Sequence, residues 1–153
     1  MFQKEASAIA LFPGGFGTHD EGFEILTLAQ TGKSDPQPIV CLQAPGCDYW
    51  DAWHGFIVSQ LLNRQLINEE DLSLFKIVAS AEAAVAEIQR FYRRYHSIRY
   101  VGRQLAMRLT QPISQEQVDL LQTRFSDLLS EGRFELRGPL DEELDEPNLI
   151  GVP

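Results

Sequence analysis

The feature of this sequence that most restricts its fold is the turn Pro13-Gly14-Gly15, which lies between an apolar run and a helical pattern. Residues 8–12 (AIALF) form a continuous apolar segment typical of a buried strand in a parallel sheet. Residues 18–31 then have helical spacing, and Gly32 follows them directly. A strand that enters a helix through glycines predicts the first strand–helix unit of an α/β fold.

The same order of elements repeats over residues 1–97. Further strands are expected at 39–42 and 75–78, and a helix at 49–63 lies between them. Asn68 and Asp71 have the spacing that starts a short helical turn. After Ser80, apolar residues recur at helical intervals: Ala81, Ala84, Val85, Ile88, Phe91, Tyr92 and Tyr95. This alternation predicts a parallel sheet with helices packed on it.

Residues 98–140 break the alternation and predict a small β-α-β appendage. We expect one strand from Ile98 to Leu109 with a bulge at Gly102, and a second strand over 133–137. Between them, a capping box of Ser114 and Gln117 predicts a helix start. Residues 141–153 are acidic and then punctuated by Pro and Gly, which predicts a loose tail.

Composition excludes several classes of partner. The 153-residue chain has a formal net charge of −9, which is unfavourable for binding nucleic acid through phosphate contacts. No apolar run approaches the ~20 residues that span a bilayer, and we find no secretory signal, so no membrane partner is expected. Cys41 and Cys47 fit neither a disulfide framework nor a metal pair, and we expect a reducing cytoplasm and no bound metal.

The glycine-rich turn carries the chemistry that the sequence suggests. Gly14, Gly15 and Gly17 let a ligand approach the backbone, and the first N–H groups of the following helix have no partner within the helix. Together with the helix dipole, these groups predict an anion site, usually for phosphate. An alternative stays open: Thr18 and Glu21 also have the spacing of a T-x-x-E capping box, which would make both residues structural.

The string PGGFGTHDEGFE resembles the PGGxGTxxE signature of the Lonely Guy (LOG) family, whose members often carry the label lysine decarboxylase. Four later segments also resemble this family: ILTLAQTGKS, PIVCL, YWDAW and FYRRYHSIRYV. The resemblance therefore extends over about residues 1–140. It implies a Rossmann-like fold and a phosphoribohydrolase. Such enzymes cleave the N-glycosidic bond of adenine-type nucleoside 5′-monophosphates, AMP or cytokinin nucleotides, to free base and ribose 5-phosphate. The resemblance implies no metal or organic cofactor.

The resemblance also implies roles for single residues. The 5′-phosphate would be held by Gly14, Gly15, Gly17 and Thr18. Glu21 would be the catalytic carboxylate, with Glu24 as a second acidic position and Asp20 as an alternative. The family implies a homodimer or higher oligomer, with the active site near the interface. Trp50 and Trp53 could serve that interface or pack in a helix core.

The sequence departs from the family in one respect that concerns activity. The family has a further half before this strand, with an Arg on the helix just upstream, and we do not equate Lys4 with that Arg. We therefore expect the chain to be the C-terminal part of a longer member. Two alternatives to the hydrolase follow: a non-catalytic nucleotide-binding module, and an inactive fragment of the fold.

Basic residues in the sequence leave one further question open. Six arginines concentrate positive charge: Arg90, Arg93, Arg94, Arg99, Arg103 and Arg108. They form either a local anion site or a solvated face that pairs with the acidic tail. The three lysines, Lys4, Lys33 and Lys76, do not lie in a context that suggests a Schiff base, so the decarboxylase label has no chemical support in the sequence.

Overall fold

The computed structural model describes residues 6–138, which divide into two compact units. The first unit ends at Arg93 and the second begins at Arg94. The expected tail at 141–153 and Lys4 lie outside the described residues.

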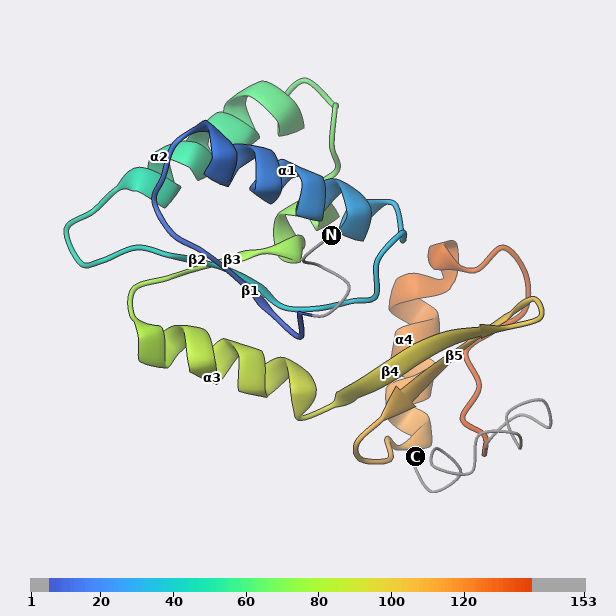
Figure 1. Cartoon of the computed structure of the whole chain (residues 1–153). Helices are drawn as coiled ribbons and strands as arrows, with labels where there is room; N and C mark the ends of the chain where they lie inside the picture. The colour runs from blue at the N-terminus through green and yellow to red at the C-terminus, as the bar shows by residue number, and fades with distance from the viewer. Residues whose placement is uncertain (1–5, 139–153) are drawn as a thin grey trace. The chain divides into compact units, whose positions relative to one another are not determined.

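The first unit is built on a parallel sheet with the strand order β1-β2-β3 (Figure 1). Its strands are β1 (Ile9–Leu11), β2 (Ile39–Leu42) and β3 (Lys76–Val78). The central strand β2 is apolar throughout, because helices cover both faces of a parallel sheet. The α/β class predicted from the alternation of elements is confirmed.

Helices cover the two faces of this sheet (Figure 1). One face carries α1 (Phe16–Gln30), α2 (Tyr49–Phe56), the π-helical turn η2 (Ile57–Leu62) and the 3₁₀ turn η3 (Glu69–Leu74). The other face carries α3 (Ala81–Tyr92), which Ser80 caps as predicted by accepting a hydrogen bond from Ala83 N. Successive residues of a strand face opposite sides, so the two sides of β2 belong to separate cores. Cys41 packs in the core under α1 and α2, and Val40 in the core under α3.

The two tryptophans of α2 are core residues. Trp50 and Trp53 are 1% and 8% exposed, and their rings meet edge to face at 5.4 Å. The helical spacing predicted for 49–63 therefore describes the buried stripe, which continues into Ile57. The alternative that these tryptophans lie on a subunit interface is wrong, because packing inside the unit already covers them.

The second unit differs from the predicted β-α-β order. The structure has two antiparallel strands, β4 (Tyr95–Val101) and β5 (Gln104–Leu109), where we predicted one strand. Gly102 has a φ of +59° and forms the turn between them instead of a bulge within one strand. The helix α4 (Gln115–Phe125) begins at the predicted capping box, with Gln117 N donating to the Ser114 side chain, and a short 3₁₀ turn η4 (Ser126–Leu128) follows.

The prediction of a strand over 133–137 is wrong. These residues have no strand conformation, and Phe134 N donates to the side chain of Gln122 at 2.9 Å instead of to a neighbouring strand. Alternation of apolar and polar residues is not sufficient for a strand, because the backbone also needs a paired edge. The appendage is therefore a hairpin followed by a helix.

Candidate functional site

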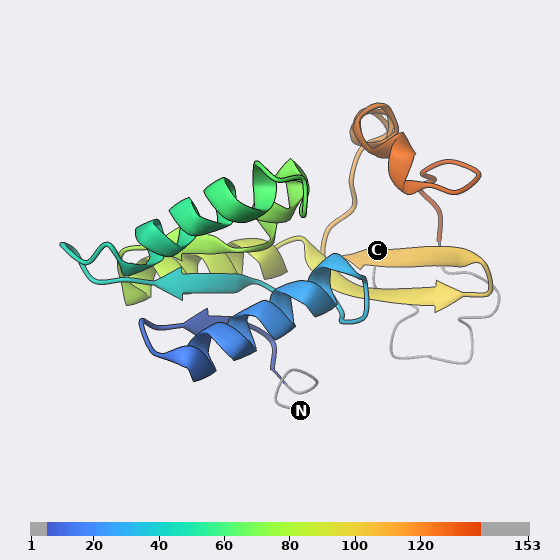
Figure 2. The same cartoon turned by 90° about the horizontal axis from the view of Figure 1, so that it is seen from above.

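The glycine-rich turn lies at the carboxyl edge of the sheet. Figure 2 shows β1 and β2 pointing the same way, and the loops that leave them lie at the same end of the sheet. One loop carries Gly14 and Gly15 into α1, and the other leads to Tyr49 at the start of α2. Ligands of parallel α/β sheets bind outside this edge.

The first helix begins earlier than the sequence predicted. Gly15 is the N-cap of α1, with φ −90° and ψ −153°, and its carbonyl accepts hydrogen bonds from Thr18 N and His19 N at 3.1 and 3.3 Å. Thr18 is thus the third residue of the helix and cannot be its N-cap. The capping-box alternative for Thr18 and Glu21 is therefore wrong, and Glu21 lies in the second turn of α1.

Three backbone donors at the start of α1 are unpaired. Within the described part of the chain, the N–H groups of Gly15, Phe16 and Gly17 donate to no acceptor. Unpaired N–H groups and the positive end of the helix dipole attract an anion to this position.

The glycines of the turn differ in their surroundings. A Cβ at Gly14 would lie 2.1 Å from the Thr18 Oγ1 atom, so only glycine allows the Thr18 hydroxyl to rest against the turn. A Cβ at Gly15 or Gly17 would meet nothing within 4 Å. The backbone is therefore tightly packed on one side of the turn and open on the other, where a ligand could approach it.

Two of the three candidate carboxylates, Glu21 and Glu24, lie on one side of α1, and Asp20 lies on another. Glu21 is half-buried, whereas Asp20 and Glu24 are exposed. Successive helical residues are about 100° apart, so Thr18 and Glu21 are separated by only about 60° and Asp20 lies about 100° from Glu21. Among residues 6–138, the Glu21 carboxylate makes no hydrogen bond or ion pair. Glu21 and Thr18 thus share one face of the first two turns.

Sequence reasoning assigned no role to two residues that contact the turn. The Tyr49 hydroxyl donates to Gly14 O at 2.5 Å, and it lies 2.8 Å from His19 Nε2. The rings of His19 and Tyr49 are stacked, with centroids 5.8 Å apart. Tyr49 comes from a different strand–helix loop, so no local spacing could have revealed its contact with Gly14.

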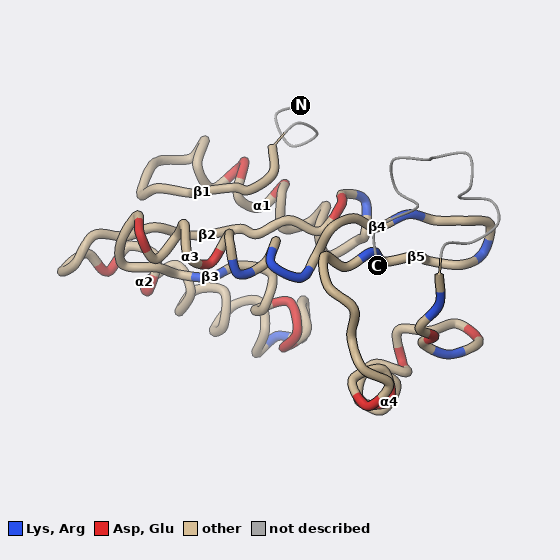
Figure 3. The backbone as a smooth tube through the Cα atoms, turned by 90° about the horizontal axis from the view of Figure 1, so that it is seen from below, with Lys and Arg blue, Asp and Glu red and all other residues tan. Residues whose placement is uncertain are grey.

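Charged residues near the turn are acidic. Neither α1 nor α2 contains Lys or Arg, and the charged positions on α1 in Figure 3 are acidic. No Lys or Arg of these two helices is therefore available to neutralise a bound anion, which would depend mainly on backbone N–H groups and the helix dipole.

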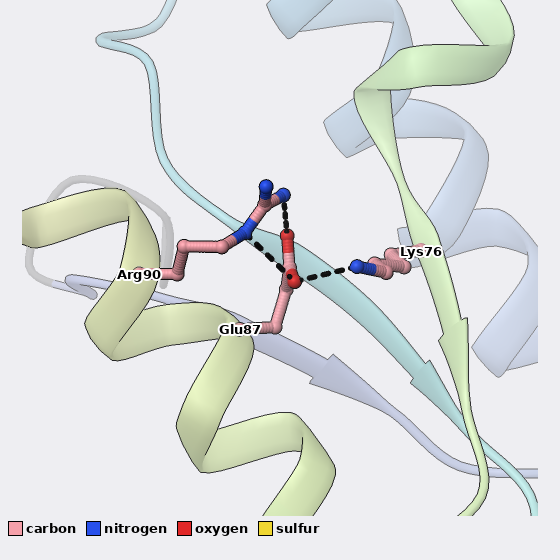
Figure 4. A network of polar contacts seen from close by, with 3 residues as sticks. All are labelled: Lys76, Glu87 and Arg90. Atoms are coloured by element: carbon pink, nitrogen blue, oxygen red, sulfur yellow. Dashed lines mark hydrogen bonds and ion pairs between the residues drawn. The ribbon is translucent and has the colours of Figure 1, made fainter.

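The described lysines lie away from the turn. Lys76 starts β3, at the opposite edge of the sheet, and its Nζ lies 2.7 Å from Glu87 Oε2 (Figure 4). Arg90 binds the same carboxylate, and the hydrogen bonds from Arg90 and Lys76 lower the pKa of Glu87. Lys33 is exposed beyond the end of α1. Neither lysine is positioned for covalent chemistry at the glycine turn.

The six arginines are divided between the two units. Arg90 and Arg93 belong to the first unit and the other four to the second. Arg90 pairs with Glu87, and Arg103 pairs with Glu131 at 2.7 Å on exposed surface. In both pairs the arginine side chain is exposed, as expected for a solvated face. The acidic tail that we expected as their partner lies outside the described residues.

The described residues were also searched for a reactive cysteine, a metal site and a membrane-spanning helix. Cys41 is fully buried, and burial raises the pKa of its thiol to about 12, so it stays protonated as a packing residue. Residues 6–138 contain no cluster of three His, Cys, Asp or Glu side chains that could hold a metal ion. No helix in that range is both long and apolar enough to cross a membrane.

Comparison with known protein families gives a match. No curated protein matches the chain. A family model described as "Possible lysine decarboxylase" matches residues 1–88 of the 153, a segment that includes all three strands of the parallel sheet and the glycine turn. The chain therefore belongs to this lysine decarboxylase-like family, the LOG family.

Proposed function

We propose that this chain hydrolyses the N-glycosidic bond of adenine-type nucleoside 5′-monophosphates, AMP or a cytokinin nucleotide, to free base and ribose 5-phosphate. One observation carries the proposal. Three N–H groups, at Gly15, Phe16 and Gly17, and the Glu21 carboxylate one to two helical turns later have no partner among residues 6–138. An anion site beside a free carboxylate suits a substrate that has a phosphate and a bond to hydrolyse.

The phosphate would bind at the start of α1. Its oxygens would accept hydrogen bonds from the three N–H groups and from the Thr18 hydroxyl, which rests against Gly14. Hydrogen bonds to a charged acceptor contribute about 1.5–3 kcal/mol each, more than those between neutral groups. This remote anchor would fix the position of the ribose relative to Glu21.

The carboxylate would act on the sugar. Breaking the bond between C1′ and N9 leaves positive charge on the ribose, as in glycoside hydrolysis. The electron pair of that bond leaves with the base, which takes up a proton from solvent. A water molecule adds its hydroxyl to C1′ and gives its other proton to Glu21. The negative charge of Glu21 also stabilises the cationic transition state.

An exposed aromatic side chain beside the turn favours a ligand that carries a base. Phe16 lies between Gly15 and Gly17 and is 96% exposed, which is unusual for a large apolar side chain. The flat face of a nucleobase could stack on such a ring. A base-bearing nucleotide therefore uses more of this surface than inorganic phosphate does.

A paired measurement separates the hydrolase from its two alternatives. The purified chain is incubated with AMP and with isopentenyladenosine monophosphate. Free base is measured by chromatography, and the melting temperature is measured with each ligand. Base release supports the hydrolase. A higher melting temperature without base release identifies a nucleotide-binding module, since a ligand that binds only the folded state stabilises it. No release and no stabilisation by either nucleotide identifies an inactive fragment.

A further inference from the structure

The contact between Tyr49 and the glycine turn determines the direction of a backbone group. The Tyr49 hydroxyl donates to the carbonyl oxygen of Gly14. In a planar trans peptide, the carbonyl of one residue and the N–H of the next point in opposite directions. Holding the Gly14 carbonyl toward Tyr49 therefore turns the Gly15 N–H away from Tyr49. That N–H is one of the three unpaired donors at the start of α1.

The hydrogen bonds around Tyr49 fix which atom carries each proton. A carbonyl oxygen only accepts, so the single hydroxyl proton of Tyr49 goes to Gly14. The His19 Nε2 atom, 2.8 Å from the same hydroxyl, must then donate to the Tyr49 oxygen. His19 thus carries its proton on Nε2, and this donor keeps the Tyr49 hydroxyl directed at Gly14. His19 is also the only basic side chain on α1.

Tyr49 is itself held firmly at the end of the sheet. Its neighbour Trp50 is 1% exposed, and the indole Nε1 donates to Leu42 O at 3.1 Å. The backbone N–H of Trp50 donates to the side chain of Gln43 at 2.8 Å, and Gln43 N donates to Val78 O. The start of α2 is thereby fixed to the carboxyl ends of β2 and β3. Tyr49 can act as a rigid support for the more open glycine turn.

We propose that Tyr49, oriented by His19, is a positioning residue of the anion site: by holding the Gly14 carbonyl it aims the Gly15 N–H at a bound phosphate. This inference rests on the proposed function for its ligand. If the Gly14 carbonyl were free to rotate toward the ligand, its negative end would face the phosphate and the Gly15 donor would be lost. Tyr49 would therefore affect affinity for phosphate-bearing ligands and not for the uncharged nucleoside.

Tyr49→Phe tests the proposal, because it removes only the hydroxyl. Affinities for AMP and adenosine are measured by titration calorimetry, and the Gly15 amide is followed by NMR without ligand. We expect AMP to bind about tenfold more weakly, as for the loss of one hydrogen bond to a charged group, and adenosine to bind as before. The Gly15 amide resonance should move. Tyr100→Phe, at a tyrosine that is 74% exposed in the second unit, is the matched control and should change nothing.

Substitutions at His19 provide a second test of the positioning role of Tyr49. His19→Leu removes the donor to Tyr49 and should weaken AMP binding, whereas His19→Gln can present an amide N–H and should restore most of it. If the wild type binds AMP and Tyr49→Phe binds it equally well, the positioning role is overturned and the proposed function stands. If Tyr49→Phe weakens AMP and adenosine alike, Tyr49 only packs, and the proposal is also overturned. If the wild type binds no AMP, the proposed function fails and the inference fails with it.

Discussion

Substitution of Gly14 provides the sharpest test of the turn geometry. A Cβ at Gly14 would lie 2.1 Å from Thr18 Oγ1 and 3.1 Å from Thr18 Cβ. Rotation of the Thr18 side chain could relieve the first contact, but it leaves the second because Cβ does not move. Overpacking of this kind costs about 1–3 kcal/mol, and the reduced freedom of the unfolded chain offsets about 0.4–1 kcal/mol of that. We therefore expect Gly14→Ala to lower the free energy of unfolding by about 1–2 kcal/mol.

Gly15→Ala is the matched control for this substitution. Gly15 has a φ of −90°, and an added Cβ would meet no atom within 4 Å. Alanine is a poorer N-cap than glycine by about 0.5–1 kcal/mol. It also restricts the unfolded chain by about 0.4–1 kcal/mol, so the net change should stay within about 0.5 kcal/mol. Urea unfolding measures both variants, with an unchanged slope taken as the sign of an unchanged two-state transition.

A double substitution identifies the source of the effect. Thr18→Ala removes the hydroxyl that meets the new Cβ, so the pair Gly14→Ala and Thr18→Ala should be more stable than the sum of the single changes predicts. The expected coupling is about 1 kcal/mol. Equal stability of Gly14→Ala and Gly15→Ala, or a coupling of zero, would refute the close contact between Gly14 and Thr18.

Three further predictions concern separate parts of the first unit. Phe16→Ala should weaken AMP binding about fivefold or more and leave ribose 5-phosphate binding unchanged, because only AMP carries a base to stack; equal losses for both ligands would contradict this. Cys41, with a thiol pKa of about 12, should resist alkylation at pH 8 until the chain unfolds, while the less buried Cys47 reacts first; mass mapping of the labelled peptides checks the order. Glu87→Gln should destabilise the fold by about 0.5–1 kcal/mol at pH 7. The Glu87 pKa lies below its ordinary value of 4.5, so its contribution is present above that value and is lost as the pH falls through the lowered pKa. A stability difference that stays constant from pH 7 to pH 3 would contradict that origin.

The order of elements in the first unit could be predicted because each element depends on local pattern. Apolar runs bounded by turns identified β1 and β2, and the stripe that contains Trp50, Trp53 and Ile57 identified α2. The start of α1 was placed too late because Thr18 and Glu21 imitate a capping box. In the folded chain, Gly15 takes the N-cap position and the Thr18 hydroxyl instead rests against Gly14.

The second unit and the surroundings of the turn depend on contacts that spacing does not encode. Gly102 fits either a bulge or a turn, and only the pairing of β4 with β5 decides between them. Phe134 alternates as in a strand but donates to a helix side chain. Tyr49 reaches Gly14 across 35 positions of sequence, so its contact follows from parallel strands that end at one edge of the sheet.

The carboxylate assignment can be tested against Asp20 on the same helix and against a carboxylate on another element. Glu21→Gln, Asp20→Asn and Glu70→Gln each replace a carboxylate with its amide. Glu70 is exposed on η3 and serves as the control that should leave activity unchanged. Loss of turnover in Asp20→Asn with retention in Glu21→Gln would transfer the catalytic role to Asp20.

The most direct test of the central claim measures binding and turnover in the same Glu21→Gln protein. The affinity for AMP is measured by calorimetry and the rate of adenine release by chromatography, beside the wild type. The proposed roles predict that Glu21→Gln binds AMP within a few-fold of the wild type, because the phosphate is held by the glycine turn, and that it releases no detectable adenine. Adenine release by Glu21→Gln at the rate of the wild type would contradict the account.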